Sequence, residues 1–340
     1  MPKHKFRECV SIESKSVDSI DVKQNAKDSK DFIESKVTQS TKPICFKPLD
    51  YSINTCMIFT HSPTPPCDID YVHFVDSDDM LSIDCIEQCI ESIGDNDIVW
   101  HDVEYLYEEG IEIQSYPSLL QSLSITQEEA NAKSFTPLEL WKNMDSFSFV
   151  HQGLFAFSLT ENLRFSTPLM NEDALFGMIL FAHAKAIKVA SFYGLIYRHH
   201  TNSVSTHGEA QNLYRKSYPS FMLPMIVAFN NDGYSIKHYY FGYSCTFVCL
   251  GLLRYIQSPH FAHNNNAALR KKLIAFMKVR AIYAFNTMIF DKDPMHTREL
   301  LKPLEPYMQK VSLPTKLAYF TPRFYKLMRT LKRTLKAITS

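Results

Sequence analysis

The chain has 340 residues, of which 45% are hydrophobic and 21% are charged, so it can bury a core, and wholesale disorder is excluded. Its 36 lysines and arginines balance 36 aspartates and glutamates, which argues against a general nucleic-acid binder. Only 9 glycines are present, and neither G-x-G-x-x-G nor G-x-x-x-x-G-K-[ST] occurs. The common glycine-rich phosphate loops are therefore excluded.

The first 42 residues are rich in serine and charged side chains and hold few large apolar ones. Because such a composition buries little surface, we predict a polar, mobile or loosely docked segment over residues 1–42. The N-terminus has no apolar signal-peptide run. We therefore expect a cytoplasmic protein with reduced cysteines.

From Pro43 onward the pattern changes to strands alternating with helices. The aromatic and β-branched run at 71–75 predicts a short strand, and a helix capped by Ser82 follows, with an apolar face of four isoleucines at positions 83, 86, 90 and 93. A further strand begins at Asp97, and Thr136 has the spacing of a capping box for a helix through Trp141. This alternation predicts an α/β domain over residues 43–208.

Residues 209–310 predict a helical region. The stretch from Phe241 to Leu253 is apolar and uncharged, but it is shorter than the roughly 20 residues that a membrane span needs, so we predict a buried core helix. A long helix is expected from Ala267 to Phe290, before prolines divide the chain into short pieces.

Two cysteine pairs, Cys85/Cys89 and Cys245/Cys249, have the i, i+4 spacing that places both thiols on one helix face. Either pair could form half of a zinc site. No histidine is clustered in the sequence around the first pair, so we predict buried free thiols.

The most distinctive polar feature is an acidic cluster of Asp76, Asp78 and Asp79 directly after the predicted strand at 71–75. Adjacent carboxylates repel one another unless a cation compensates, and hard oxygen ligands suit Mg²⁺ or Mn²⁺. Such a metal would hold a diphosphate and neutralise its charge as it leaves. The alternative is a solvated acidic turn that caps the next helix.

Residues 71–81 read Y-V-H-F-V-D-S-D-D-M-L, which resembles the Y-[IV]-x-F-[LV]-D-S-D-D-x-L segment of bacterial family-2 glycosyltransferases with the A-type nucleotide-sugar fold. A second block, from Met170 to Ser205, resembles the family's acceptor-side pattern E-D-x-x-F … Y-x-Y-R … S-x-S. The two blocks have the expected order and separation. The resemblance implies an α/β fold with a Rossmann-like mixed sheet flanked by helices, followed here by a helical C-terminal region.

The resemblance also implies roles for individual residues. Asp78 and Asp79 would bind a divalent metal, Mn²⁺ or Mg²⁺, and together with Asp76 would bind the diphosphate or ribose of the donor. Asp173 would act as the general base on an acceptor hydroxyl, with Glu172 beside it, which implies inversion at the anomeric carbon. Without the upstream block, this acidic pair would be interpreted as a favourable charge at a helix N-terminus.

Other polar residues have two interpretations each. Arg198, with His199 and His200, could reach the donor diphosphate, since a guanidinium matches phosphate oxygens in pairs, or could form an exposed strand end. His101 and Asp102 could line the donor pocket, but a surface pair after a strand is favoured.

The N-terminal part departs from the family, because its opening strand, typically V-S-I-I-I-P-V-Y-N, and its acidic D-D-G-S-T-D strand are not visible. We therefore expect an atypical or truncated donor side. The main hypothesis is transfer of a hexose or N-acetylhexosamine from a nucleotide sugar to a hydroxyl of a glycan or lipid-linked glycan, in surface polysaccharide or lipopolysaccharide biosynthesis. The alternative is a catalytically inactive homologue that acts as a membrane-associated assembly or glycan-binding partner.

Residues 311–340 predict a basic amphipathic helix. After Glu305 no acidic residue occurs, and the basic ones are Lys310, Lys316, Arg323, Lys326, Arg329, Lys332, Arg333 and Lys336. Helical spacing is kept by the apolar residues Phe324, Leu327, Met328, Leu331, Leu335 and Ile338. Such a helix can lie on an anionic membrane, which would make the protein peripheral on the inner face of the plasma membrane, or can pack on the protein body. RNA binding is disfavoured because no aromatic platform accompanies the charges.

Overall fold

The computed structural model describes residues 19–21, 69–160, 163–165, 169–200, 217–262 and 266–339. Most of the predicted mobile segment at 1–42 lies outside these ranges. Within it, β1 (Ser19–Asp21) pairs antiparallel with β7 (Ser217–Pro219), with Ile20 opposite Tyr218. The predicted helical region at 209–310 thus includes a short strand near its start.

A mixed five-stranded sheet forms the α/β part of the chain. Its strands are β2 (Tyr71–His73), β3 (Met80–Leu81), β4 (Ile98–Tyr107), β5 (Gly153–Ala156) and β6 (Ile187–His199). The spatial order is β2-β5-β4-β6-β3, in which β4 and β6 run parallel and the other neighbours antiparallel. The predicted mixed α/β class is confirmed.

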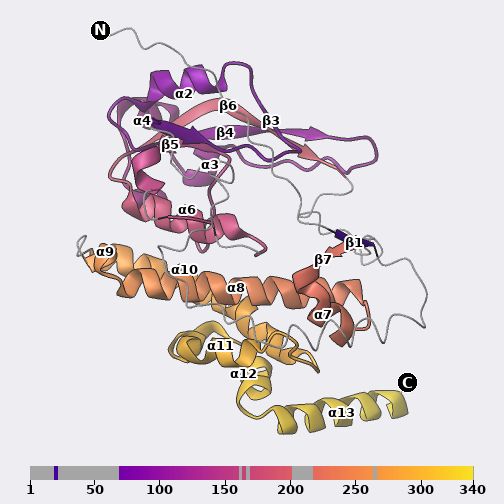
Figure 1. Cartoon of the computed structure of the whole chain (residues 1–340). Coiled ribbons are helices and arrows are strands. Elements are labelled where there is room, and N and C mark those ends of the chain that lie inside the picture. Colours follow the sequence, from indigo (N-terminus) through magenta and orange to yellow (C-terminus); the bar gives the residue numbers. More distant parts are fainter. Residues whose placement is uncertain are drawn as a thin grey trace.

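One face of this sheet is covered by α2 (Cys85–Ile93), which lies above the sheet in Figure 1. Its buried residues are Cys85, Cys89 and Ile93, and they pack with Val99 and Leu154 of the sheet. The predicted face of four isoleucines is wrong, because Ile83 precedes the helix and is fully exposed. The predicted cap is also wrong, because the helix begins after Asp84 and not after Ser82.

Several short helices and α6 lie on the opposite face of the sheet or beside its end. They are α3 (Leu119–Leu123), α4 (Gln127–Ala132), α5 (Pro137–Leu140), the 3-10 turn η1 (Phe157–Thr160) and α6 (Glu172–His183). The capping box predicted at Thr136 is present, with Glu139 as its partner, although α5 ends one residue before Trp141. Equivalent boxes begin α3 and α4, so local hydrogen bonds explain why these short helices start where they do.

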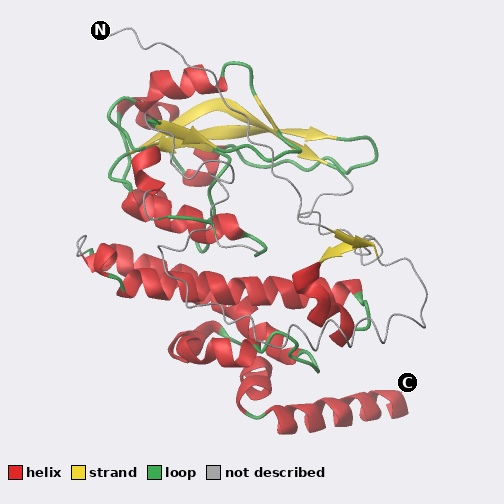
Figure 2. Cartoon of the chain, viewed as in Figure 1, coloured by secondary structure: helices red, strands yellow, loops and turns green. Residues whose placement is uncertain are grey.

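The rest of the chain is helical, as Figure 2 shows. Its elements are η3 (Ser220–Met222), α7 (Leu223–Ala228), α8 (Gly233–Gln257), α9 (Pro259–Ala262), α10 (Ala267–Asn286), η4 (Thr287–Ile289), α11 (Thr297–Leu301), η5 (Lys302–Lys310), α12 (Leu313–Phe320) and α13 (Pro322–Thr339). The apolar stretch predicted as a core helix is the buried middle of α8. No helix in the described ranges combines the length and the apolar character needed to cross a membrane.

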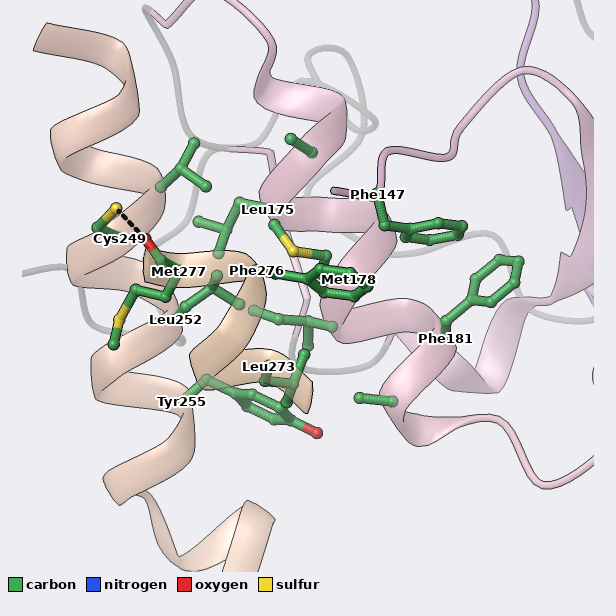
Figure 3. Packing of buried hydrophobic residues seen from close by; sticks show 14 of the residues in the cluster. Phe147, Leu175, Met178, Phe181, Cys249, Leu252, Tyr255, Leu273, Phe276 and Met277 are labelled. Atoms are coloured by element: carbon green, nitrogen blue, oxygen red, sulfur yellow. Dashed lines mark hydrogen bonds between the residues drawn. The ribbon is translucent and has the colours of Figure 1, made fainter. Parts of the chain in front are cut away.

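A single hydrophobic cluster joins the sheet to the helical region through α6. Figure 3 shows Leu175 and Met178 of α6 facing side chains of α8 and α10, whereas the Phe181 ring points away from these helices and lies against Trp100 of β4. The contact is close, because a Cβ on Gly251 of α8 would lie 2.5 Å from Leu175 Cδ2. Between α8 and α10, Cys249 Sγ donates a hydrogen bond to the Met277 carbonyl over 3.5 Å. The first turn of α6 is therefore anchored to both parts of the molecule.

Gly177 brings a second segment against α6. A Cβ at this position would lie 2.5 Å from the backbone nitrogen of Phe149, so only glycine allows the two backbones to approach this closely. The contact fixes the segment before β5, which includes His151, beside the start of α6.

Candidate functional site

The three predicted metal-binding aspartates lie on the connection between β2 and β3. The Asp79 amide donates to the Asp76 carbonyl over 3.1 Å, which closes a tight turn. One carboxylate oxygen from each of Asp76, Asp78 and Asp79 lies within 4.8 Å of the other two. None of the three caps α2, whose N-cap is Asp84, so the helix-capping alternative is wrong.

The end of β6 holds this acidic turn in place. β3 pairs antiparallel with β6, with Met80 opposite Ile196. Two bonds follow from this pairing: the Arg198 amide donates to Asp79 Oδ1 over 2.9 Å, and His200 Nε2 lies 2.9 Å from Asp78 Oδ2. The first and second sequence blocks therefore meet at the turn.

His151, just before β5, contacts the turn from the other side. Its Nδ1 lies 3.7 Å from Asp76 Oδ2, and the side chain is partly buried. Its electrostatic effect lowers the pKa of both Asp79 and Asp173. The charge of His151 thus acts on both the acidic turn and the predicted general base, and the sequence analysis missed this residue because an isolated histidine gives no pattern.

Glu172 and Asp173 form the first turn of α6, after Asn171 in the left-handed conformation. Burial raises the pKa of Glu172, and repulsion from Asp173 and Asp76 adds to the rise while its own backbone N–H opposes it. The negative charge of Asp76, in the acidic turn, is thus one of the smaller causes of the raised pKa of Glu172.

Burial also raises the pKa of Asp173. Arg280 of α10, His151 and a hydrogen bond from Ser148 oppose this rise. The carboxylate is therefore partly removed from water but is surrounded by groups that favour its charged form. Arg280 and Ser148 were not predicted, because only tertiary packing brings α10 and the segment before β5 to the start of α6.

The side chains of Arg198 and His199 do not point to the aspartates. Arg198 forms an ion pair with Glu108, with Nε 2.8 Å from Oε1. The His199 ring stacks on Tyr107 with a centroid distance of 4.7 Å and also lies against Tyr116. Their predicted contact with a donor diphosphate stays a prediction.

His101 and Asp102 are inside β4 and are buried, so the prediction of a surface pair after a strand is wrong. Asp102 accepts hydrogen bonds from the amides of Val103 and Leu119, over 2.9 and 3.0 Å, and so fixes the start of α3. It has a structural role, and His101 faces the opposite side of the sheet, toward α2.

The acidic turn suits a divalent cation. Asp79 Oδ2 is buried and has no hydrogen-bond partner, although burial already raises the pKa of this group. Among the described residues, the ion pairs of Asp76 and Asp78 are with histidines, and no lysine or arginine occupies the space between the carboxylates. A hard cation would satisfy the unpaired oxygen and relieve the repulsion among the three carboxylates.

No model of a known protein family matches the sequence, and no curated protein matches it. The structure is distantly similar to S. aureus TarS. The match to TarS 1–349 in complex with UDP-GlcNAc covers 65% of this chain and 60% of that chain, with 14% identity and a TM-score of 0.32. A second match to S. aureus TarS covers 78% of this chain and 38% of that chain, with 14% identity and a TM-score of 0.36.

The TarS 1–349 structure in complex with UDP is matched at 16% identity and a TM-score of 0.29, over 63% of this chain and 66% of that chain. This chain thus spans about 60% of the length of the first of these structures. The similarity is one of chain arrangement only and assigns no role to any residue of this chain.

Proposed function

We propose that this chain is a metal-dependent, inverting glycosyltransferase. It transfers a hexose or N-acetylhexosamine from a nucleotide sugar to a hydroxyl of a glycan or lipid-linked glycan in surface polysaccharide or lipopolysaccharide biosynthesis. The observation that supports this best is the meeting of two carboxylate groups from distant parts of the sequence. Asp76 of the acidic turn and Asp173 of α6 both interact with His151.

Asp76, Asp78 and Asp79 would hold Mn²⁺ or Mg²⁺, and the bound ion would supply positive charge to a diphosphate leaving group. Arg198 and His199 would assist in binding the donor once Arg198 separates from Glu108. A guanidinium pairs with phosphate oxygens as it does with this carboxylate. The donor would therefore lie at the edge of the sheet where the acidic turn meets the end of β6.

Asp173 would act as the general base. The acceptor oxygen forms a bond to the anomeric carbon while the bond from that carbon to the diphosphate oxygen breaks, and the acceptor proton moves to Asp173. A pKa raised by burial makes this carboxylate a stronger base, while the charges of Arg280 and His151 oppose that rise. Glu172 adds negative charge beside it and would contribute to binding the acceptor.

The first experiment measures donor binding by calorimetry with UDP and GDP, in Mn²⁺ and in EDTA. We expect at least one nucleotide to bind in Mn²⁺. Its affinity in EDTA should be lower by a factor of about ten or more, because the carboxylates then repel the diphosphate. Equal affinity in both conditions would contradict a metal role for Asp78 and Asp79.

The second experiment compares Asp173→Asn with the wild type in sugar transfer and in hydrolysis of a panel of UDP and GDP sugars, including UDP-GlcNAc. We expect donor affinity to be kept and turnover to fall by about 10²–10⁴, which is the usual contribution of a general base. The control is Asp95→Asn, at an exposed position after α2, which should leave turnover unchanged. If the Asp173→Asn variant turns over at the wild-type rate, Asp173 is not the general base and only places a negative charge at the N-terminus of α6.

The second candidate function, a catalytically inactive homologue that binds glycans or an assembly partner, is favoured by the missing family pattern at the start of the sequence. If the wild type neither transfers nor hydrolyses any sugar of the panel but binds glycan fragments, this candidate replaces the first.

A further inference from the structure

A second polar cluster lies between the sheet and α2, on the face of the sheet opposite to α6. It consists of His73 of β2, His101 of β4, and Cys85 and Cys89 of α2. One ligand atom from each residue lies within 4.8 Å of all the others. His101 and both cysteines have no exposed surface, and His73 is partly buried.

The hydrogen bonds of the two imidazoles determine where their free lone pairs point. His73 Nδ1 lies 2.8 Å from the Phe74 carbonyl, and His101 Nδ1 lies 2.9 Å from the Asp102 carbonyl. A carbonyl can only accept, so both Nδ1 atoms are protonated donors. In neutral rings both Nε2 atoms then have a lone pair and no proton.

These two Nε2 atoms face each other at 2.8 Å. Two lone pairs at this distance repel unless a cation lies between them. Cys85 Sγ lies beside both nitrogens, 3.7 Å from His73 Nε2 and 3.8 Å from His101 Nε2. Among the described residues, no carboxylate forms an ion pair with either imidazole, so a buried imidazolium would have no carboxylate partner.

The backbone is shaped to admit these rings. A Cβ on Gly194 of β6 would lie 2.6–2.7 Å from three atoms of the His101 ring, so only glycine leaves room for it. The pairing of β4 with β6 is also irregular on both sides of Asp102, next to His101. The histidine pair therefore occupies a space that the sheet provides for it.

We propose that His73, Cys85, Cys89 and His101 bind one Zn²⁺ in a closed, structural site. Two imidazole nitrogens and two thiolates are the ligand set of many structural zinc sites, and the two thiolates neutralise the ion, as burial requires. Zn–N distances of about 2.0–2.1 Å and Zn–S distances of about 2.3 Å place tetrahedral N and S ligands about 3.5 Å apart. The Cys85–histidine distances are close to this value, and the two nitrogens would separate by about half an ångström.

A zinc ion at this site would hold in place the two ends of the segment that contains the acidic turn. His73 lies three residues before Asp76, and Cys85 lies six residues after Asp79. A zinc ion would thus join β2, β4 and α2 on both sides of the turn, although it takes no part in the sugar transfer. Each ring's Nδ1 bond to a backbone carbonyl is the kind of outer contact that orients a metal-binding histidine.

The test is the metal content of the full-length protein after dialysis, measured by mass spectrometry. We expect about one zinc per chain in the wild type, and less than about one tenth of that in Cys85→Ser/Cys89→Ser. The matched control is Cys245→Ser/Cys249→Ser, which changes the buried cysteine pair of α8 and should keep the zinc. Asp78→Asn/Asp79→Asn should also keep it, which separates this site from the acidic turn.

A second measurement on the wild type avoids the risk that a cysteine variant fails to fold. Replacing zinc with Co²⁺ should give the intense visible absorption of a tetrahedral site and a thiolate charge-transfer band. Removing zinc with a chelator should lower the unfolding temperature by more than about 5 °C.

The proposal fails if the wild type contains no zinc even after it is refolded with Zn²⁺. It also fails if the variant Cys85→Ser/Cys89→Ser retains the zinc. The histidines then share a proton.

Discussion

Carboxylates at the candidate site are held closer together and less hydrated than stability alone would favour. Burial raises the pKa of Asp79, Glu172 and Asp173, and repulsion between neighbouring acids contributes for Asp79 and Glu172. A fold tolerates such crowding where a ligand or cation relieves it, so the same residues that destabilise the free protein are the ones expected to bind charge.

Glu172→Gln should stabilise the free protein at neutral pH. The pKa of Glu172 is higher in the folded chain than in the unfolded one. The contribution of this group to folding stability is therefore fully present below the unfolded-state pKa and is lost as pH rises through the folded-state pKa. A neutral isostere avoids that loss. We expect the unfolding temperature to rise by about 1–3 °C at pH 7 and to be unchanged near about pH 4.

Thermal unfolding followed by circular dichroism at both pH values measures this effect. Glu91→Gln, at an exposed position of α2, is the control and should show no difference at either pH. A lower unfolding temperature for Glu172→Gln at pH 7 would mean that the ionised carboxylate is stabilised by a contact other than those described.

At the scale of single elements, α13 is unusual because the described apolar side chains of its stripe, Phe324, Leu327, Met328 and Leu331, are exposed. Tyr325 packs on the main core, and Arg329 donates to the Ile289 carbonyl and to Asp291, which attaches the start of the helix. Figure 1 shows the rest of α13 extending away from the body. Phe324 is 51% exposed and Leu327 is 57% exposed, so the alternative that this stripe is part of the core is wrong for these residues.

We propose that the stripe docks on an anionic membrane surface, because its cations complement anionic lipid headgroups. Each Lys or Arg near such a surface contributes about 1 kcal/mol, so Arg323, Lys326 and Lys332 together would contribute several kcal/mol. The protein should sediment with phosphatidylserine-containing vesicles at low salt, and less at high salt because ions screen the attraction.

Phe324→Gln/Leu327→Gln/Leu331→Gln should reduce this sedimentation by about tenfold, since the apolar insertion is lost. The control, Leu313→Gln/Phe320→Gln, changes exposed apolar residues of α12 and should sediment like the wild type. Equal sedimentation of all three proteins, or binding to neutral vesicles alone, would rule out docking through α13.

At the scale of the whole molecule, the hydrophobic core crosses from the sheet to the helices without interruption. Trp141 lies beside Phe276 of α10, with ring centroids 5.3 Å apart, and also stacks on Phe181 of α6. All three side chains are fully buried. The α/β part and the helical region therefore share core residues, and we expect them to unfold together.

Phe276→Ala tests this coupling. Removing a buried phenylalanine should destabilise the protein by about 3–5 kcal/mol. Both tryptophans, Trp100 and Trp141, lie in the α/β part, whereas most helical signal comes from the C-terminal half. We expect tryptophan fluorescence and circular dichroism to shift by the same amount in urea, and Ile113→Ala, at an exposed position, to shift neither. A shift in only one signal would mean two independent domains.

Patterns between residues near each other in the sequence determined several elements correctly. Composition and spacing predicted the strand before Asp76, the capping box at Thr136 and the buried middle of α8. These features depend on side-chain type, on hydrogen bonds within one turn and on local apolar runs, which are all present in the sequence itself. The resemblance also predicted that the two acidic blocks form one site, and this stays a prediction.

Only the tertiary structure decided which distant residues meet. Sequence spacing put four isoleucines on one buried face, whereas Ile83 and Ile90 are exposed, and Cys85 and Cys89 face the sheet beside Ile93. The sequence also gave no sign that His73 and His101 lie beneath these cysteines, because β5, which separates their strands, comes about fifty residues later in the chain. His151 and Arg280 were missed for the same reason. Their positions depend on strand order and helix packing, which bring together groups that no local pattern connects.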